Sequence, residues 1–247
     1  IATTVLRGNV GIGTTSPTAT LQVIGNIHAG AGGSGANSNF IGSGAGTGNT
    51  GSNNTGVGTF ALNASPSGSH NSGFGYGTLY ANGTGVGNTA SGYAALISNT
   101  SGSYNSATGY SSLFNNLGGL QNVASGYNSL YSNTSGGYNV AIGAGALYAN
   151  LTGSSNSAIG YLAGRYQADG TTALTDAGTS VFLGSFCRGV AAGANQISIG
   201  YNAIGLGANT TVIGNSSTTL TMLHGALQVD NTAVAATPTA THTITVK

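Results

Sequence analysis

The sequence contains almost no charge. Of its 247 residues, four are Lys or Arg and three are Asp or Glu, so charged residues make up 3% of the chain, whereas about 25% is usual. Proteins that bind nucleic acid need clustered Lys and Arg to replace the counterions of the phosphates. The sequence has no such cluster, and we therefore expect no nucleic-acid partner.

Cysteine and long apolar runs are scarce as well. Cys187 is the only cysteine, so an intrachain disulfide is excluded and a buried, unreactive thiol is expected. No apolar run approaches the ~18 residues of a membrane-spanning helix. We therefore expect no membrane insertion.

Residues that could carry catalysis or bind a metal are few and scattered. Asp169 and Asp176 are the only neighbouring acids, and Arg165 nearby suggests an ion pair or a capped turn rather than the paired carboxylates of a glycan hydrolase. The histidines show no metal-ligand spacing, although a trimer could bring three copies of one histidine to a shared axis. They are His28, His70, His224 and His242. The expectation is a protein that is not an enzyme and holds no cofactor or metal.

What the sequence does contain is a repeat. A short phrase, with forms such as NTASGYAALISN, NVASGYNSLYSN and NVAIGAGALYAN, recurs every 17 residues. Its regular Leu, Tyr and Ala positions argue for order despite the 45 glycines of the chain. An unbroken repeat of this length predicts a solenoid, in which each copy forms one coil and the coils stack along an axis. The copies open at Asn54, Asn71, Asn88, Asn105, Asn122, Asn139 and Asn156.

Glycines at a fixed phase, here called phasing glycines, extend the repeat. After Gly160 they resume at Gly184, Gly200 and Gly214, so the spacing tightens to 16 and then 14 residues. The expected fold is all-β, a β-solenoid or β-roll of about ten short coils. We predict a β connector and Gly-rich hinge at residues 1–36, the 17-residue coils at 37–164, an excursion loop at 165–183, terminal coils at 184–217 and a β connector at 218–247.

Each coil is expected to hold a short strand, a glycine turn, a second short strand and a polar loop. A Leu four residues after the phasing glycine, such as Leu79 or Leu96, predicts a hydrophobic ladder inside the stack. The residue two before the glycine is small in every 17-residue copy, which suggests that a neighbouring chain packs closely against it. This candidate subunit-contact column comprises Ala90, Ala107, Ala124, Ala141 and Ala158.

A stripe of tyrosines directly after the phasing glycines is the candidate contact for a glycan or another receptor. Stacked tyrosines beside Asn and Ser could lie against sugar rings. The alternative is an aromatic ladder that stabilises neighbouring coils or seals a seam between chains. The stripe comprises Tyr76, Tyr93, Tyr110, Tyr127 and Tyr161.

Two stretches resemble known families. VGIGTTSPTATLQVIGN, at residues 10–26, resembles a segment common in bacteriophage tail-fibre proteins, often upstream of a trimeric fibre region. NVAIGAGALYAN, NSAIGYLAGRY and NQISIGYNAIGLGANTTVIGNSS, within residues 139–217, resemble the heads of trimeric autotransporter adhesins. This second resemblance implies a left-handed parallel β-roll with three chains side by side. The 17-residue period is longer than that family's typical ~14 residues, and a phage fibre that uses the same coil accommodates the difference.

Together these features predict a structural and adhesive fibre segment. A thin coil buries little apolar area, so association of chains would help to offset its ordering entropy, and we expect a parallel homotrimer. The segment would be extracellular, in a virion tail fibre, where it serves as a rigid spacer and as a receptor-binding element for a host-surface glycan or protein, next to other fibre components. Three separate rolls and an intertwined triple β-helix both remain open. The alternative functions are the head of a bacterial trimeric autotransporter adhesin and a glycan depolymerase.

Overall fold

The computed structural model describes residues 10–12, 21–23, 37–190 and 194–219. The chain divides into two units, Ile1–Ser217 and Thr218–Lys247. The predicted hinge and C-terminal connector fall almost entirely outside the described residues. Within the described residues, no helix is present and hence none that could cross a membrane.

Two short strands near the start of the chain, β1 (Val10–Ile12) and β2 (Leu21–Val23), pair in parallel with each other. Both lie within the stretch that resembles tail-fibre segments.

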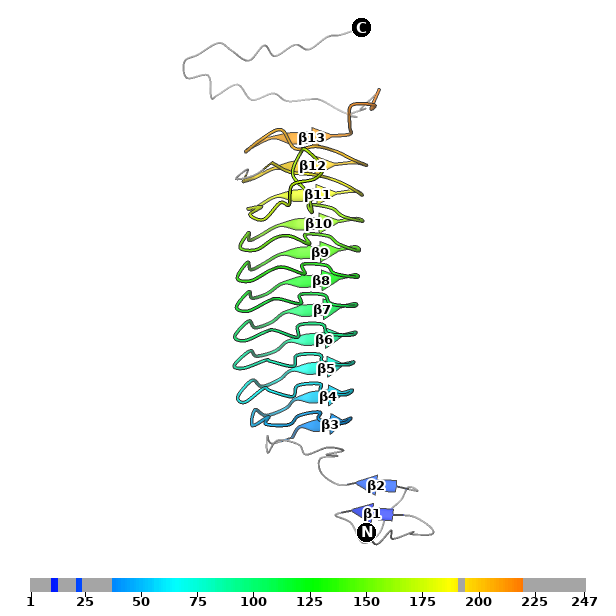
Figure 1. Cartoon of the computed structure of the whole chain (residues 1–247), viewed down its shortest axis with the longest axis vertical. Coiled ribbons are helices and arrows are strands. Elements are labelled where there is room, and N and C mark those ends of the chain that lie inside the picture. Colours follow the sequence, from blue (N-terminus) through cyan, green and yellow to red (C-terminus); the bar gives the residue numbers. More distant parts are fainter. Residues whose placement is uncertain (1–9, 13–20, 24–36, 191–193, 220–247) are drawn as a thin grey trace, which may run out of the picture. The chain divides into compact units, whose positions relative to one another are not determined.

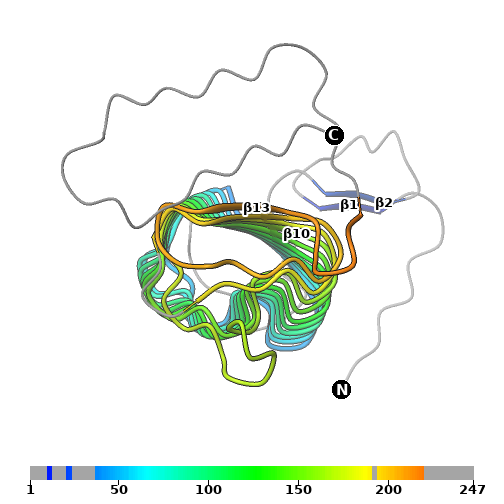
Figure 2. The same cartoon turned by 90° about the horizontal axis from the view of Figure 1, so that it is seen from above.

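Eleven further strands form one parallel sheet, with one strand in each coil and each strand paired to the next in the sequence (Figure 1). Seen along the stack, the coils superpose as closed loops of a single chain (Figure 2). The predicted all-β solenoid of about ten coils is therefore confirmed. The strands are β3 (Asn39–Ile41), β4 (Thr55–Val57), β5 (Ser72–Phe74), β6 (Thr89–Ser91), β7 (Ser106–Thr108), β8 (Val123–Ser125), β9 (Val140–Ile142), β10 (Ser157–Ile159), β11 (Val181–Leu183), β12 (Ile197–Ile199) and β13 (Thr211–Ile213).

The middle residue of each strand points into the coil, because successive strand residues alternate in direction. The alanines at this position are 0–1% exposed in a single chain and belong to its core. The prediction that Ala90, Ala107, Ala124, Ala141 and Ala158 form a subunit contact is therefore wrong. The close backbone is the far wall of the same coil, since a Cβ built on Gly56 would lie 3.3 Å from the carbonyl oxygen of Ala61.

The predicted leucine ladder forms the opposite half of the core. Its members are completely buried, namely Leu62, Leu79, Leu96, Leu113, Leu130 and Leu147. Where a glycine replaces the leucine, a phenylalanine fills the volume. Phe40 in β3 lies against Gly46, and Phe182 in β11 lies against Gly164, so closely that a Cβ on either glycine would overlap the ring. The core thus keeps a constant thickness along the stack.

The second strand predicted for each coil is absent from the 17-residue coils. Residues two and four after the phasing glycine have positive φ, for example 55° at Ala94 and 52° at Leu96. This alternation sends the two N–H groups in opposite directions along the stack. Ala94 donates to the carbonyl of Tyr76 in the preceding coil, and Leu96 donates to that of Ser112 in the following coil. The segment therefore bonds both neighbours without strand geometry, at a cost in left-handed residues of about 1–2 kcal/mol each.

The phasing glycines fix the distance between coils at one corner. Their φ lies between 91° and 136°, a region that other residues rarely adopt. A Cβ built on Gly109 would lie 2.6 Å from the carbonyl oxygen of Gly126 in the next coil. The sequence analysis used these glycines only to set the phase of the repeat, and the structure supplies their physical reason.

Two ladders of buried asparagines run through the stack, and the sequence analysis did not anticipate them. In the first, the backbone N–H of each Asn that opens a copy from Asn71 to Asn156 donates to Oδ1 of the corresponding Asn in the preceding coil, at 2.8–3.0 Å. The Nδ2 of Asn105, for example, also donates to the carbonyl of Gly119. In the second ladder, each Nδ2 donates to the carbonyl three residues ahead. Its members are Asn82, Asn99, Asn116, Asn133 and Asn150.

The excursion between β10 and β11 leaves the stack as a lateral loop (Figure 2). An antiparallel bridge between Tyr166 and Ala173 closes it at the base. The coils resume at β11, so the excursion ends before residue 183, where the sequence analysis set its boundary.

Replacing Asn105 by Ala should lower the free energy of unfolding by about 3 kcal/mol. The change leaves the buried N–H of Asn122 without its acceptor, whereas the carbonyl of Gly119 keeps the bond from Nδ2 of Asn116. Denaturant unfolding followed by circular dichroism measures the effect. The matched control is Asn115→Ala in the same coil, since Asn115 is half-buried and outside both ladders. Equal losses in the two variants would contradict the role of the ladder.

Replacing Gly109 by Ala should destabilise the stack by about 3 kcal/mol, because the new methyl meets the next coil and the backbone conformation excludes a side chain. Gly118→Ala is the control, because the nearest atom to its Cβ is Oγ of Ser101 at 3.5 Å. We expect that variant to be neutral or slightly stabilised. Thermal unfolding of both variants distinguishes these outcomes, and a tolerated Gly109→Ala would disprove the close approach.

Candidate functional site

The predicted tyrosine stripe lies on the surface as a ladder of rings. Tyr76, Tyr93, Tyr110 and Tyr127 are 46–59% exposed, and successive ring centroids lie 5.1, 4.9 and 5.4 Å apart with interplanar angles of 6–20°. The rings therefore stack on one another as the alternative interpretation predicted. Because their faces cover each other, only edges and hydroxyl groups remain for a ligand along this part of the stripe.

The ladder is interrupted at Ala144, which occupies the position that a tyrosine holds in the coils before and after it. Tyr127 and Tyr161 flank this position from the coils before and after it, and an open recess of 90 Å³ lies between them. It is lined by Tyr127, Asn128, Ala144, Gly145, Tyr161, Leu162 and Arg165. Beyond it, Tyr161 packs edge-on against Phe186, with ring centroids 5.2 Å apart. Of the stripe residues, Tyr127 and Tyr161 thus border the gap, and the other three lie within the continuous ladder.

A second ladder of stacked aromatic rings ends at the cationic side chain of Arg165. Phe114, Tyr131 and Tyr148 stack at centroid distances of 4.9 and 5.1 Å. Arg165 occupies the same phase one coil later, and its guanidinium carbon lies 4.2 Å from the centroid of Tyr148 and 5.0 Å from that of Tyr166. This cation–π arrangement leaves the charge without a carboxylate partner in the described part of the chain.

The excursion builds a second recess, of 210 Å³, over Arg188. Tyr166 and Phe186 supply its aromatic walls, and Gly170 and Asn202 complete the lining. The guanidinium donates to the carbonyl of Ala168 and to Oδ1 of Asn202. Its Nε is buried and has no hydrogen-bond partner among the described residues. The excursion thus places an arginine between aromatic side chains, and the sequence analysis did not identify Arg188.

Asp169, one of the two acids of the excursion, is held by hydrogen bonds within its own turn. The pKa of Asp169 is lowered from its ordinary 3.8 to about 2, because the Thr172 hydroxyl and the N–H groups of Thr171 and Thr172 donate to the carboxylate. This is the predicted capped turn. A general acid needs a raised pKa, so Asp169 does not fit that role, and Asp176 is exposed.

The remaining candidates offer little chemistry. The thiol of Cys187 is buried as predicted, burial raises its pKa, and Sγ lies 2.9 Å from the carbonyl oxygen of Gly200. Among the described residues, no cluster of His, Cys, Asp or Glu could hold a metal ion. His70 is exposed, and the other three histidines lie outside the described residues.

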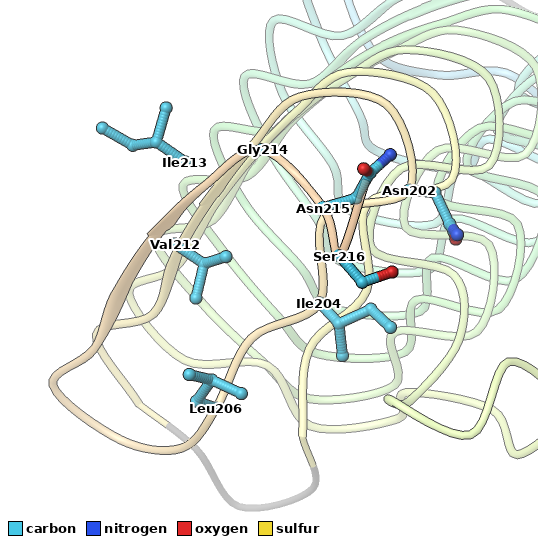
Figure 3. Close-up of a pocket in the computed structure, with 8 residues that line it drawn as sticks. All are labelled: Asn202, Ile204, Leu206, Val212, Ile213, Gly214, Asn215 and Ser216. Carbon is cyan, nitrogen blue, oxygen red and sulfur yellow. The ribbon is translucent and has the colours of Figure 1, made fainter. Parts of the chain in front are cut away.

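A recess of 330 Å³ lies at the last described coil (Figure 3). Val212 and Leu206 lie on the inner side of that coil, and Ile213 points away from it. Side chains that a following coil would cover are therefore open here, and Leu206 is 77% exposed. Among the described residues nothing covers this end of the core, and the lining of the recess carries no charged residue.

Comparison with family models finds none that matches the chain, and comparisons with curated proteins and with solved structures find no similar protein. The function therefore has to be inferred from the geometry of the chain.

Removing the hydroxyl of Thr172 should raise the pKa of Asp169 toward 3.8. In the wild type, the favourable interactions of the ionised carboxylate are complete above the ordinary pKa and are lost as the pH falls toward 2. A carbon-detected NMR titration of Thr172→Val measures the shift. Thr175→Val, an exposed substitution outside the capped turn, serves as the control. An unchanged midpoint in Thr172→Val would contradict the hydroxyl contact.

Proposed function

We propose that the chain is a structural and adhesive segment of an extracellular fibre, best matched by a phage tail fibre, and that it works as a parallel homotrimer. The observation that carries the proposal is the unbroken parallel stack from β3 to β13, which presents regular rows of side chains along one axis. Such a stack suits a spacer that also displays a binding surface.

The bonding between coils supports the role of a rigid spacer. Each coil donates backbone hydrogen bonds to both neighbours, and buried asparagines add side-chain bonds at the same phase. Among the described residues no salt bridge contributes, so the stack should keep its stability over a wide range of salt concentration. Those properties suit a fibre exposed to changing external conditions.

The outer face of the sheet is the surface that best suits contact between chains. An apolar residue stands at the same phase on each of the C-terminal coils, and four of them are 42–49% exposed while Ile199 is half-buried. The four are Ile142, Ile159, Leu183 and Ile213. Parallel copies related by a three-fold axis would bring equal coils together, so each apolar row would meet the same row of its neighbours. Because each coil closes within one chain, three separate rolls fit this arrangement better than an intertwined triple helix.

A homotrimer would also make a weak surface site effective. Three copies of one site on a rigid support raise the avidity for a surface that carries many receptors, without any new contact. Host cell-surface glycans are the receptors that best suit the tyrosine-lined recesses.

Light scattering on the native particle of residues 1–247 should give a mass of about three times 23.9 kDa. The double variant Ile142→Asp with Ile159→Asp should give folded monomers, because it places charges within the apolar row. The control Leu117→Asp with Leu120→Asp changes exposed leucines of the polar loop and should remain trimeric. A monomeric wild type at all concentrations would refute the trimeric fibre.

A further inference from the structure

The gap in the tyrosine ladder is the place along the stripe where ring faces are not covered by a neighbouring tyrosine. Tyr127 and Tyr161 are separated by two coils, which corresponds to about 10 Å. Two van der Waals contacts of about 4 Å each leave room between them for a single puckered, saturated ring. The ring stack that excludes sugars from the rest of the stripe thus leaves one slot of suitable width.

Arg165 gives this slot a positive charge. Its guanidinium lines the same recess and rests on the rings of Tyr148 and Tyr166, with no carboxylate partner among the described residues. Asn128 also lines the slot, and its Oδ1 is buried without a hydrogen-bond partner in the part of the chain that the structure describes. A rotation of that amide toward a ligand hydroxyl would therefore break no bond of Oδ1.

The slot adjoins the recess over Arg188, because Tyr161 of the slot packs against Phe186 of that recess. Tyr166 contacts Arg165 with its ring and also forms a wall of the second recess. The chain has four Lys and Arg residues in all, and two of them therefore face adjoining aromatic recesses. Asp169 forms no ion pair with either arginine among the described residues, and its carboxylate accepts hydrogen bonds from Thr171 and Thr172 of its own turn.

We propose that the two recesses form one site for an acidic oligosaccharide, in which one sugar ring lies between Tyr127 and Tyr161 and sugar carboxylates bind Arg165 and Arg188. This inference rests on the proposed adhesive function and names its ligand class. A guanidinium binds a carboxylate through two parallel N–H donors, and the aromatic walls match the apolar faces of the sugar rings. A neutral glycan would leave both cations unused.

The test measures calorimetric binding of tetragalacturonic acid and of maltotetraose, a neutral tetramer, to the full 247-residue chain. We expect the acidic tetramer to bind more tightly and to weaken as salt is added. Arg165→Gln and Arg188→Gln should each weaken its binding about 10-fold or more, because each removes charge-assisted hydrogen bonds.

The variant Ala144→Tyr distinguishes a loss of binding from a loss of folding. The new ring continues the ladder and fills the slot, so the variant should unfold at a higher temperature than the wild type and yet lose the acidic tetramer. Ala144→Ser, which keeps the slot open, is the matched control and should bind normally. Undiminished binding by Ala144→Tyr would overturn the assignment of the slot.

The remaining outcomes distinguish this inference from the proposed fibre. Equal binding of both tetramers, or arginine variants that bind normally, would overturn the acidic-glycan site and leave an adhesive trimer intact. Failure of the acidic tetramer to bind at millimolar concentration would also overturn it. A monomeric chain that binds the acidic tetramer through Arg165 and Arg188 would support the site while refuting the trimeric fibre.

Discussion

The structure depends on satisfying the hydrogen bonds of a very thin interior. One strand of three residues per coil cannot supply enough ladder bonds, and the core between the coil walls is only one leucine and one small residue deep. Buried asparagines supply further bonds, because each amide of the first ladder accepts a backbone N–H from the next coil and donates to a carbonyl within the interior. A buried polar group without such a partner would cost about 1–3 kcal/mol, so the phase of Asn is as strictly determined as that of Gly or Leu.

Periodicity made the fold readable from the sequence. A fixed spacing of glycine and leucine is sufficient to infer stacked coils with a leucine interior, because only stacking brings residues of equal phase together. Whether the alanine column faces the interior of the coil or another chain could not be decided in the same way. A small side chain suits a tight interior as well as a tight interface, and the distinction depends on how narrow the coil is. The unpredicted left-handed residues likewise follow from bonding between coils, which no local preference of Leu or Ala indicates.

The binding surface was only partly visible in the sequence. The regular spacing of the tyrosines predicted the stripe, whereas the candidate site in the structure lies where that spacing is interrupted. Ala144 replaces a ring, Arg165 takes the phase of a tyrosine, and the excursion brings Tyr166 and Gly170 over Arg188. The first two departures can be read from an alignment of the copies with one another. The third could not be foreseen, because the loop returns to the stack through contacts between residues about 20 positions apart.

The equivalence of the coils has a consequence for how such a molecule can change over generations. Every 17-residue copy presents the same bonding pattern to the copy before it and to the copy after it. A duplication or deletion of one whole copy would therefore leave the cross-section intact and alter the length in steps of about 4.8 Å. Recombination between neighbouring copies of the coding sequence is the natural source of such events. The length of the array can therefore change by whole coils while the packing of its interior stays the same.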